Sequence, residues 1–273
     1  MLLKFVSVLS LISILGACSS GDGGISGTGF DIKGAAQKGP FALGSSVLVN
    51  YLTEAGESSS ETITTETIDD LGNFEFTINR QAALRISVQG YNFNEILGKL
   101  SDSTLTLRAI YSATDTVEQN ASVNVLTHLI HNRVLKLIET GSAASAAIDQ
   151  AQLEFIATFQ KVLIVDNVAD FTNLNIYNLE DQFTDSNAYL LALSAVVYQY
   201  AISKANIKEN SIDAELTSVL NYLALDFADD GEISDEVMLG DLATASRLVR
   251  PNNIEENLAN RSYQVTNQRL QVV

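Results

Sequence analysis

The hydrophobic pattern of the chain changes its period near residue 120. Before this point, apolar and polar residues alternate in short runs, at residues 47–52, 74–78 and 84–88, as is typical of half-buried strands. After it, apolar residues recur every three or four positions and form one helical stripe: Val123, Leu126, Leu129, Ile130, Val134, Leu137 and Ile138. A period of two residues places apolar side chains on one face of a strand, and a period of 3.6 residues places them on one face of a helix. The sequence therefore predicts an α+β protein, with strands first and helices after them.

Turn residues divide the first part at intervals of about 8–12 residues, which favours a small β-sandwich over βαβ units. We expect this sandwich, Ig-like or prealbumin-like, over residues 30–110, and an all-α helical domain over residues 120–273. After the first helix, further helices are expected at 143–165, 186–205, 211–226, 234–249 and 253–265, with Asp or Ser near most starts. Neither Pro40 nor Pro251 interrupts an expected helix.

Near the start of the sequence, Lys4 is followed by an apolar run at residues 5–16. Twelve residues are too few to cross a hydrocarbon core of ~30 Å as a helix, so residues 1–17 are predicted to be an export signal. Residues 188–202, the most apolar stretch later in the chain, contain Ser194 and Gln199 and are expected to form a buried helix.

The signal ends in Leu15-Gly16-Ala17-Cys18. This tetrapeptide resembles the lipobox of bacterial lipoproteins, and the resemblance implies that Cys18 becomes the first residue and carries the lipid anchor. Ser19 after the cysteine is, in that family, usually associated with the outer membrane. The small residues of 18–29 are expected to form a flexible tether. The alternative is an ordinary signal peptide with a chance cysteine.

The first part resembles carboxypeptidase regulatory-like domains, which have a prealbumin-like fold, in residues 33–49 and 67–76. Asp69, Gly72 and Phe74 match the family's turn, in which the carboxylate bonds its own backbone, the glycine supplies a positive φ and the aromatic enters the core. Residues 123–129 and the Ala-rich helix after them are similar to helical regions that follow Ig-like modules in bacterial lipoproteins. Neither resemblance implies a catalytic residue.

The formal net charge is −17, which excludes nucleic acid as a partner. The helical part is the acidic one, because residues 111–273 contain 22 of the 33 acidic residues. One cysteine and two histidines exclude a disulfide framework and a Cys/His metal site. No nucleophile elbow, metalloprotease motif or phosphate-binding glycine loop occurs, so no catalytic residue is assigned.

His128 and His131 are three residues apart on the first expected helix, so both imidazoles can share one face. A metal site there needs a third ligand from distant sequence. The spacing here is H-x-x-H, whereas the specific zinc motif is H-E-x-x-H, with a glutamate and with its histidines four residues apart. We expect these histidines to serve packing or to form a polar pair on the helix surface.

Residues 226–236 are rich in carboxylates. Placing Gly231 at the sixth position of a calcium loop puts Asp226 first and Asp230 fifth, with Glu236 one residue before the twelfth position. Asp226, Asp230 and Glu236 are therefore a candidate calcium site. The alternative is a solvated loop between helices with Ser234 as an N-cap, which two missing ligands favour.

These patterns predict a lipid-anchored protein of the bacterial cell envelope, placed at the outer membrane, that acts as a non-enzymatic binding or structural module. Its expected partners are the membrane, through the anchor, and another envelope or surface protein. Two alternatives stay open: a hydrolase of envelope glycan or peptide with a site between the two domains, and a calcium-stabilised adhesion module.

Overall fold

A computed structural model describes residues 29–116, 118–164, 168, 170–177 and 184–261. Residues 1–17, predicted to be the signal, and Cys18 lie outside the described residues, together with most of the expected tether and residues 262–265 of the last expected helix.

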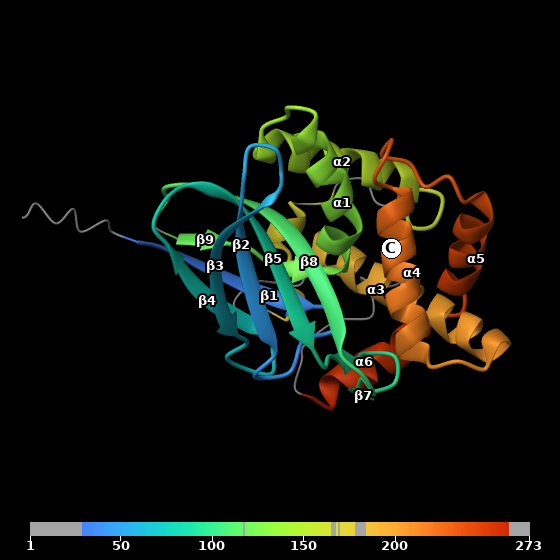
Figure 1. The fold of residues 1–273 in the computed structure, drawn as a ribbon. Helices are drawn as coiled ribbons and strands as arrows, with labels where there is room; N and C mark the ends of the chain where they lie inside the picture. Colours follow the sequence, from blue (N-terminus) through green and yellow to red (C-terminus); the bar gives the residue numbers. More distant parts are fainter. Residues whose placement is uncertain (1–28, 117, 165–167, 169, 178–183, 262–273) are drawn as a thin grey trace, which may run out of the picture.

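The described chain is of mixed α+β class, with its strands before its helices, as predicted. The strands are β1 (Phe30–Gln37), β2 (Ser46–Leu52), β3 (Ser58–Glu66), β4 (Asn73–Ile78), β5 (Ala82–Gly90), β6 (Phe93–Asn94), β7 (Lys99–Leu100), β8 (Leu105–Ala113), β9 (Glu118–Asn120) and β10 (Val123–Asn124). The helices are α1 (Val125–Glu139), α2 (Ala144–Phe159), the 3-10 turn η1 (Phe171–Asn173), α3 (Asp185–Lys208), α4 (Ile212–Asp226), α5 (Glu236–Ser246) and α6 (Pro251–Ala259). Strands and helices occupy opposite sides of the molecule (Figure 1).

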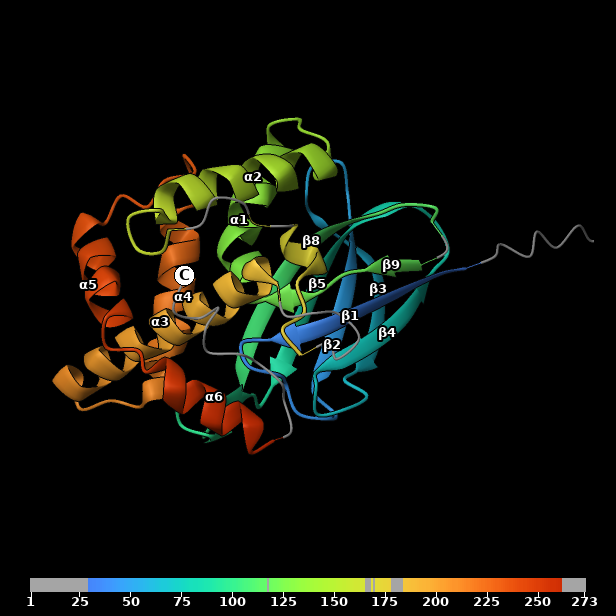
Figure 2. The same ribbon diagram turned by 180° about the vertical axis from the view of Figure 1, so that it is seen from behind.

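The strands form two larger sheets. One has the antiparallel order β3-β2-β5-β8, and its inward side chains Val49, Ile86 and Leu107 are completely buried. The other is centred on β1, which pairs antiparallel with β4 on one edge and parallel with β9 and then β10 on the other (Figure 2). Both edges of β1 are therefore hydrogen-bonded, and only its two faces offer side chains for other contacts.

The sequence did not predict β9 and β10, which lie between the expected sandwich and the first expected helix. Strand pairing thus continues past residue 110, and Val123 belongs to β10 rather than to the helical stripe. Helix α1 starts at Val125 because Asn124 caps it: the Asn124 Oδ1 accepts from the Thr127 N–H at 2.9 Å, and the Thr127 hydroxyl accepts from the Asn124 N–H at 2.8 Å.

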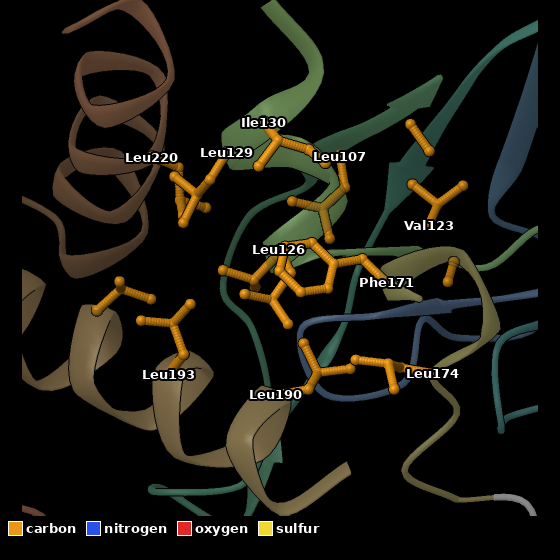
Figure 3. Packing of buried hydrophobic residues seen from close by; sticks show 14 of the residues in the cluster. Leu107, Val123, Leu126, Leu129, Ile130, Phe171, Leu174, Leu190, Leu193 and Leu220 are labelled. Atoms are coloured by element: carbon orange, nitrogen blue, oxygen red, sulfur yellow. The ribbon is translucent and has the colours of Figure 1, made fainter. Parts of the chain in front are cut away.

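Helix α1 joins the strands to the other helices. Its residues Leu126, Leu129 and Ile130 are buried where β8, α3, α4 and η1 meet (Figure 3). The buried apolar residues of the two sheets and of the helices form one continuous cluster. Each buried leucine or isoleucine of this kind contributes about 1.5–3 kcal/mol to folding.

The other helices agree with the expected ones in order and approximate position. α3 contains the apolar stretch at 188–202 and is buried along most of its length, as expected. In the described residues, no helix combines the length and apolar character needed to cross a membrane. Several boundaries were wrong: α2 ends at Phe159 rather than 165, α3 continues to Lys208 rather than 205, α5 ends at Ser246 rather than 249, and α6 covers Pro251–Ala259 rather than 253–265. Helix α5 is capped by Asp235, not by Ser234.

Candidate functional site

A cleft of about 500 Å³ lies between the outer face of the β1–β4 sheet, residues 173–177 and the first turn of α3. Strands β1, β4 and β9, which contribute residues to its lining, are labelled in Figure 2. Its volume is ordinary for a small-molecule site. The cleft therefore lies where the strand part meets the helical part.

The floor of the cleft is a row of three exposed side chains on neighbouring strands. Lys33 on β1 is in register with Glu75 on β4 and with Asn120 on β9. Residues in register on adjacent strands lie about 4.5–5.5 Å apart at their Cβ atoms, so these three groups present an ammonium, a carboxylate and an amide side by side. No hydrogen bond of the Asn120 amide is formed within the described residues.

One wall includes three asparagines. In Asn175 and Asn187 the amide oxygen is already bound, whereas Asn173 Nδ2 donates to Asp170 Oδ2 at 3.2 Å. Asn175 Oδ1 accepts from Gln37 Nε2 at 2.6 Å and from the Tyr177 N–H at 3.1 Å. Asn187 Oδ1, in the first turn of α3, accepts from the Asn175 N–H at 3.2 Å. Each oxygen fixes the orientation of its amide. Within the described residues, the Nδ2 groups of Asn175 and Asn187 have no partner and remain available as donors.

Gln37 holds this wall on the sheet. Its side chain is fully buried, and its Oε1 accepts from the Ile176 N–H at 2.9 Å while its Nε2 donates to Asn175. Burial of an amide costs little free energy when both its oxygen and its nitrogen are hydrogen-bonded, whereas loss of one partner leaves a buried polar atom unsatisfied and destabilises the protein. The position of Asn175 is therefore set by β1.

The opposite wall is the turn before β4, where Ile68 is 56% exposed and Leu71 is half-buried. Asp69 Oδ1 accepts from the Leu71 and Asn73 N–H groups at 3.0 Å each, and Asp69 Oδ2 accepts from Asn73 Nδ2 at 2.7 Å. Within the described part of the chain, these bonds leave the Asn73 Oδ1 as the free end of that amide.

The turn has the local features that its sequence motif implies. Asp69 bonds its own backbone, Gly72 has a φ of +79°, and Phe74 is 1% exposed. A Cβ at position 72 would lie 2.4 Å from the Ala36 carbonyl oxygen, so glycine is required by space as well as by conformation.

His128 and His131 are both buried on α1, with their ring centroids 5.1 Å apart. The His131 Nδ1–H donates to the His128 carbonyl oxygen, whereas both ring nitrogens of His128 have no partner in the described residues. Burial lowers the pKa of His131 to about 4, and repulsion from Arg108 adds to this. Burial lowers the pKa of His128 well below its ordinary value, with smaller contributions from His131 and then Arg108. The described residues place no carboxylate as a third ligand beside the pair.

The three residues of the candidate calcium site have other partners. Asp226 Oδ2 accepts from the Ser234 N–H at 2.8 Å, and Asp230 Oδ1 accepts from the Glu232 N–H at 3.0 Å. Glu236 forms an ion pair of 2.7 Å with Lys161. In the parts of the chain that are described, no group of three His, Cys, Asp or Glu residues is arranged to hold a metal.

A guanidinium occupies the inner side of the same loop. Arg133 donates to the Asp229 carbonyl oxygen at 2.6 Å and forms a two-contact pair with Glu154, at 2.7 and 3.0 Å. The Glu154 carboxylate, and beyond it Asp229 and Asp230, raise the pKa of Arg133. A fixed cation thus already binds the loop carbonyl, which is a function that a calcium ion serves in a calcium loop. The described contacts do not support calcium binding, which stays a hypothesis.

A buried ion pair that the sequence did not indicate links the strands to the helices. Lys38 Nζ lies 2.8 Å from Glu95 Oε1 and 4.6 Å from the ring centre of Tyr198 on α3. Asn257 on α6 donates to the carbonyl oxygens of Glu95 and Ile96 at 3.0 Å each. Neither Lys38 nor Glu95 lines the cleft described above. Its arrangement suits a structural connection.

Sequence reasoning missed the cleft because its residues are distant from one another in the chain and match no motif. The one local signal was the density of asparagines around residues 173–175. No model of a known protein family matches this chain, and no curated protein or solved structure is significantly similar to it.

Proposed function

We propose that the protein is a lipid-anchored component of the bacterial cell envelope, held at the outer membrane, that binds another envelope component in this cleft without catalysis. The single observation that carries the binding role is the amide wall, in which Asn175 and Asn187 are oriented through their oxygens while their Nδ2 groups are left to donate. A wall of preoriented donors reduces the ordering cost of binding.

The anchor follows from the resemblance at Leu15–Cys18. One acyl chain binds a membrane only marginally, whereas two or three bind it durably, because each buried methylene contributes about 0.8 kcal/mol. With the lipid on Cys18, the folded part stays at the membrane surface, where its acidic helical part offers a face to other proteins. We assign the strand part to the prealbumin-like sandwiches on the residues of the 69–74 turn.

Binding explains the cleft better than hydrolysis. Glycoside hydrolysis by the usual mechanism uses two carboxyl groups on either side of the scissile bond. Among the described residues that line the cleft, Glu75 is the one carboxylate, and its in-register neighbour is Lys33. The histidines, the other candidates for proton transfer, are buried on α1 and do not line the cleft.

Photocrosslinking in intact cells tests the proposal. A photoreactive amino acid replaces Asn120, which is exposed on the cleft floor, and the control replaces Asn221, which is exposed on α4 outside the cleft. We expect a crosslinked envelope component from position 120 and not from position 221. Equal capture at the two positions, or turnover of envelope glycan or peptide by the purified protein, contradicts the proposed role.

Fractionation of the Cys18→Ser variant tests the anchor. The wild type is expected in the outer-membrane fraction and the variant in the soluble fraction, because the variant cannot accept the thioether-linked lipid. Ser19→Ala is the matched control and retains the cysteine. A Cys18→Ser protein that fractionates like the wild type contradicts lipid anchoring.

A further inference from the structure

We infer that the cleft binds an uncharged, hydroxyl-rich glycan segment. This inference rests on the proposed binding function and names the class of its ligand.

The charge of the cleft points to an uncharged ligand. The chain has a net charge of −17, yet the described residues that line the cleft include one lysine and one glutamate as their charged members, and these two are neighbours in register on β1 and β4. A site for an anion concentrates cationic groups, and a site for a cation concentrates carboxylates. The charges of Lys33 and Glu75 compensate one another, so the cleft favours neither an anionic nor a cationic ligand.

The hydrogen-bonding groups favour a ligand that both donates and accepts. On one wall the Nδ2 groups of Asn175 and Asn187 donate, because the oxygens of both amides are already bound. Asn73 Oδ1 on the other wall and the Glu75 carboxylate on the floor accept, because the Nδ2 of Asn73 is bound to Asp69 and a carboxylate has no donor. A hydroxyl is an uncharged group that donates one hydrogen bond and accepts others. Several hydroxyls on one rigid ring match a cleft that offers both donors and acceptors.

The strand order argues against an extended peptide as the ligand. Peptides that add to a sheet use the unpaired backbone of an edge strand. The floor of this cleft is the face of a sheet whose central strand, β1, is paired with β4 on one edge and with β9 and β10 on the other. A ligand on the floor therefore meets side chains that project from this face, and the backbone of β1 is not available for strand addition.

The apolar wall supplies the remaining contact. Ile68 is 56% exposed and adjoins the half-buried Leu71 at the same cleft. A sugar ring has C–H groups on its faces and hydroxyls around its rim, so it can cover this wall while its rim reaches the amides. The chain has no tryptophan, and the apolar contact comes from aliphatic side chains.

Binding of the full mature protein in detergent to a panel of immobilised oligosaccharides tests the inference. The panel contains uncharged hexose and N-acetylhexosamine chains, the same chains with uronate or sulfate groups, and unstructured peptides. We expect binding to members of the uncharged set, with an affinity that changes less than twofold between 50 and 500 mM NaCl, because screening does not affect an uncharged ligand.

Two variants connect that binding to the cleft. Asn175→Asp keeps an oxygen for Gln37 and Tyr177 but replaces the donor by a carboxylate, and it is expected to weaken binding about tenfold or more. Asn120→Ala removes an exposed amide with no partner in the described residues, so the fold is retained, and a loss of about threefold or more is expected. Asn221→Asp, the same chemical change outside the cleft, is the matched control.

Binding confined to the charged glycans or the peptides, no binding to any glycan, or equal binding by the wild type and both cleft variants overturns the glycan assignment. The in-cell crosslink separates this failure from failure of the proposed function. A peptide or protein captured specifically at position 120 overturns the glycan and leaves the binding role standing, whereas no specific capture together with no glycan binding overturns both.

Discussion

Lys38 and Glu95, 57 residues apart in the chain, form an ion pair of 2.8 Å in which neither side chain is exposed. Glu95 Oε2 has no partner in the described residues, so the carboxylate depends on Lys38 for its charge compensation. The ring of Tyr198 lies against the ammonium. The pair therefore fixes the end of β1 against the β6–β7 hairpin and α3.

Removing one member of this pair is expected to destabilise the protein strongly. Lys38→Met leaves a buried carboxylate uncompensated and is predicted to lower the free energy of unfolding by about 3–5 kcal/mol. Lys38→Met combined with Glu95→Leu leaves no buried charge and is predicted to recover at least half of that loss. Urea denaturation monitored by circular dichroism measures both. A double variant no more stable than Lys38→Met contradicts the argument.

The histidine pair is expected to make the protein less stable in mild acid. In the unfolded chain an imidazole takes up its proton near pH 6.5, whereas His131 in the folded protein stays neutral until about pH 4. The unfolded state thus binds more protons between these values. The free energy of unfolding therefore keeps its full value above pH 6.5 and decreases as the pH falls towards 4. His131 alone accounts for a decrease of about 3 kcal/mol.

The double variant His128→Leu, His131→Leu removes both histidines of the chain. It is predicted to unfold in urea at pH 7 within about 1 kcal/mol of the wild type, because the rings that it replaces are buried and the two nitrogens of His128 lack partners there. Between pH 7 and pH 5 its stability should fall less than that of the wild type. Parallel losses in the two proteins would show that the carboxylates, and not the histidines, cause the acid sensitivity.

The sequence predicted those parts of the fold that depend on local periodicity. Alternation identified β2, β4 and β5, and the 3.6-residue stripe identified α1, because one face of each is buried. β9 and β10 are two or three residues long, too short to have a period of their own, and they exist because β1 offers them an edge.

The cleft could not be predicted because no local rule places Lys33, Glu75 and Asn120 in one row. Their proximity depends on the registers of β1 with β4 and β9. The burial of Lys38 could not be predicted from the sequence either. A lysine is expected at the surface unless it is paired, and its partner Glu95 is distant in the chain.

Gly72 and Gly44 separate the conformational cost of an alanine from its steric cost. Both have a φ of +79°, but a Cβ at position 44 meets nothing within 4 Å, whereas one at position 72 would lie 2.4 Å from the Ala36 carbonyl oxygen. Gly44→Ala is predicted to cost about 1 kcal/mol. Gly72→Ala is predicted to cost about 2–4 kcal/mol, because the backbone of β1 must move as well. Urea midpoints of the two variants, measured together, compare them; equal midpoints would contradict the steric part.

A substitution of Arg133 tests the two interpretations of residues 226–236, as a loop between helices or as a calcium site. Arg133→Met leaves the Glu154 carboxylate without its two guanidinium contacts and the Asp229 carbonyl oxygen without its donor, so we expect a loss of about 2–4 kcal/mol in the free energy of unfolding. Lys136→Met on the same helix is the matched control, because its contact with Glu139 is exposed and is expected to contribute less than about 1 kcal/mol.

Calcium completes this test. If the guanidinium holds the loop, millimolar calcium leaves the melting temperature of the wild type within about 1 °C of its value in chelator, and Asp226→Asn together with Asp230→Asn does not change that difference. A calcium-dependent increase of several degrees that the double variant abolishes would show that the carboxylates bind the ion despite their backbone contacts. The first result assigns the loop to the packing of α1 against α2 and α4, and the second assigns it to a metal.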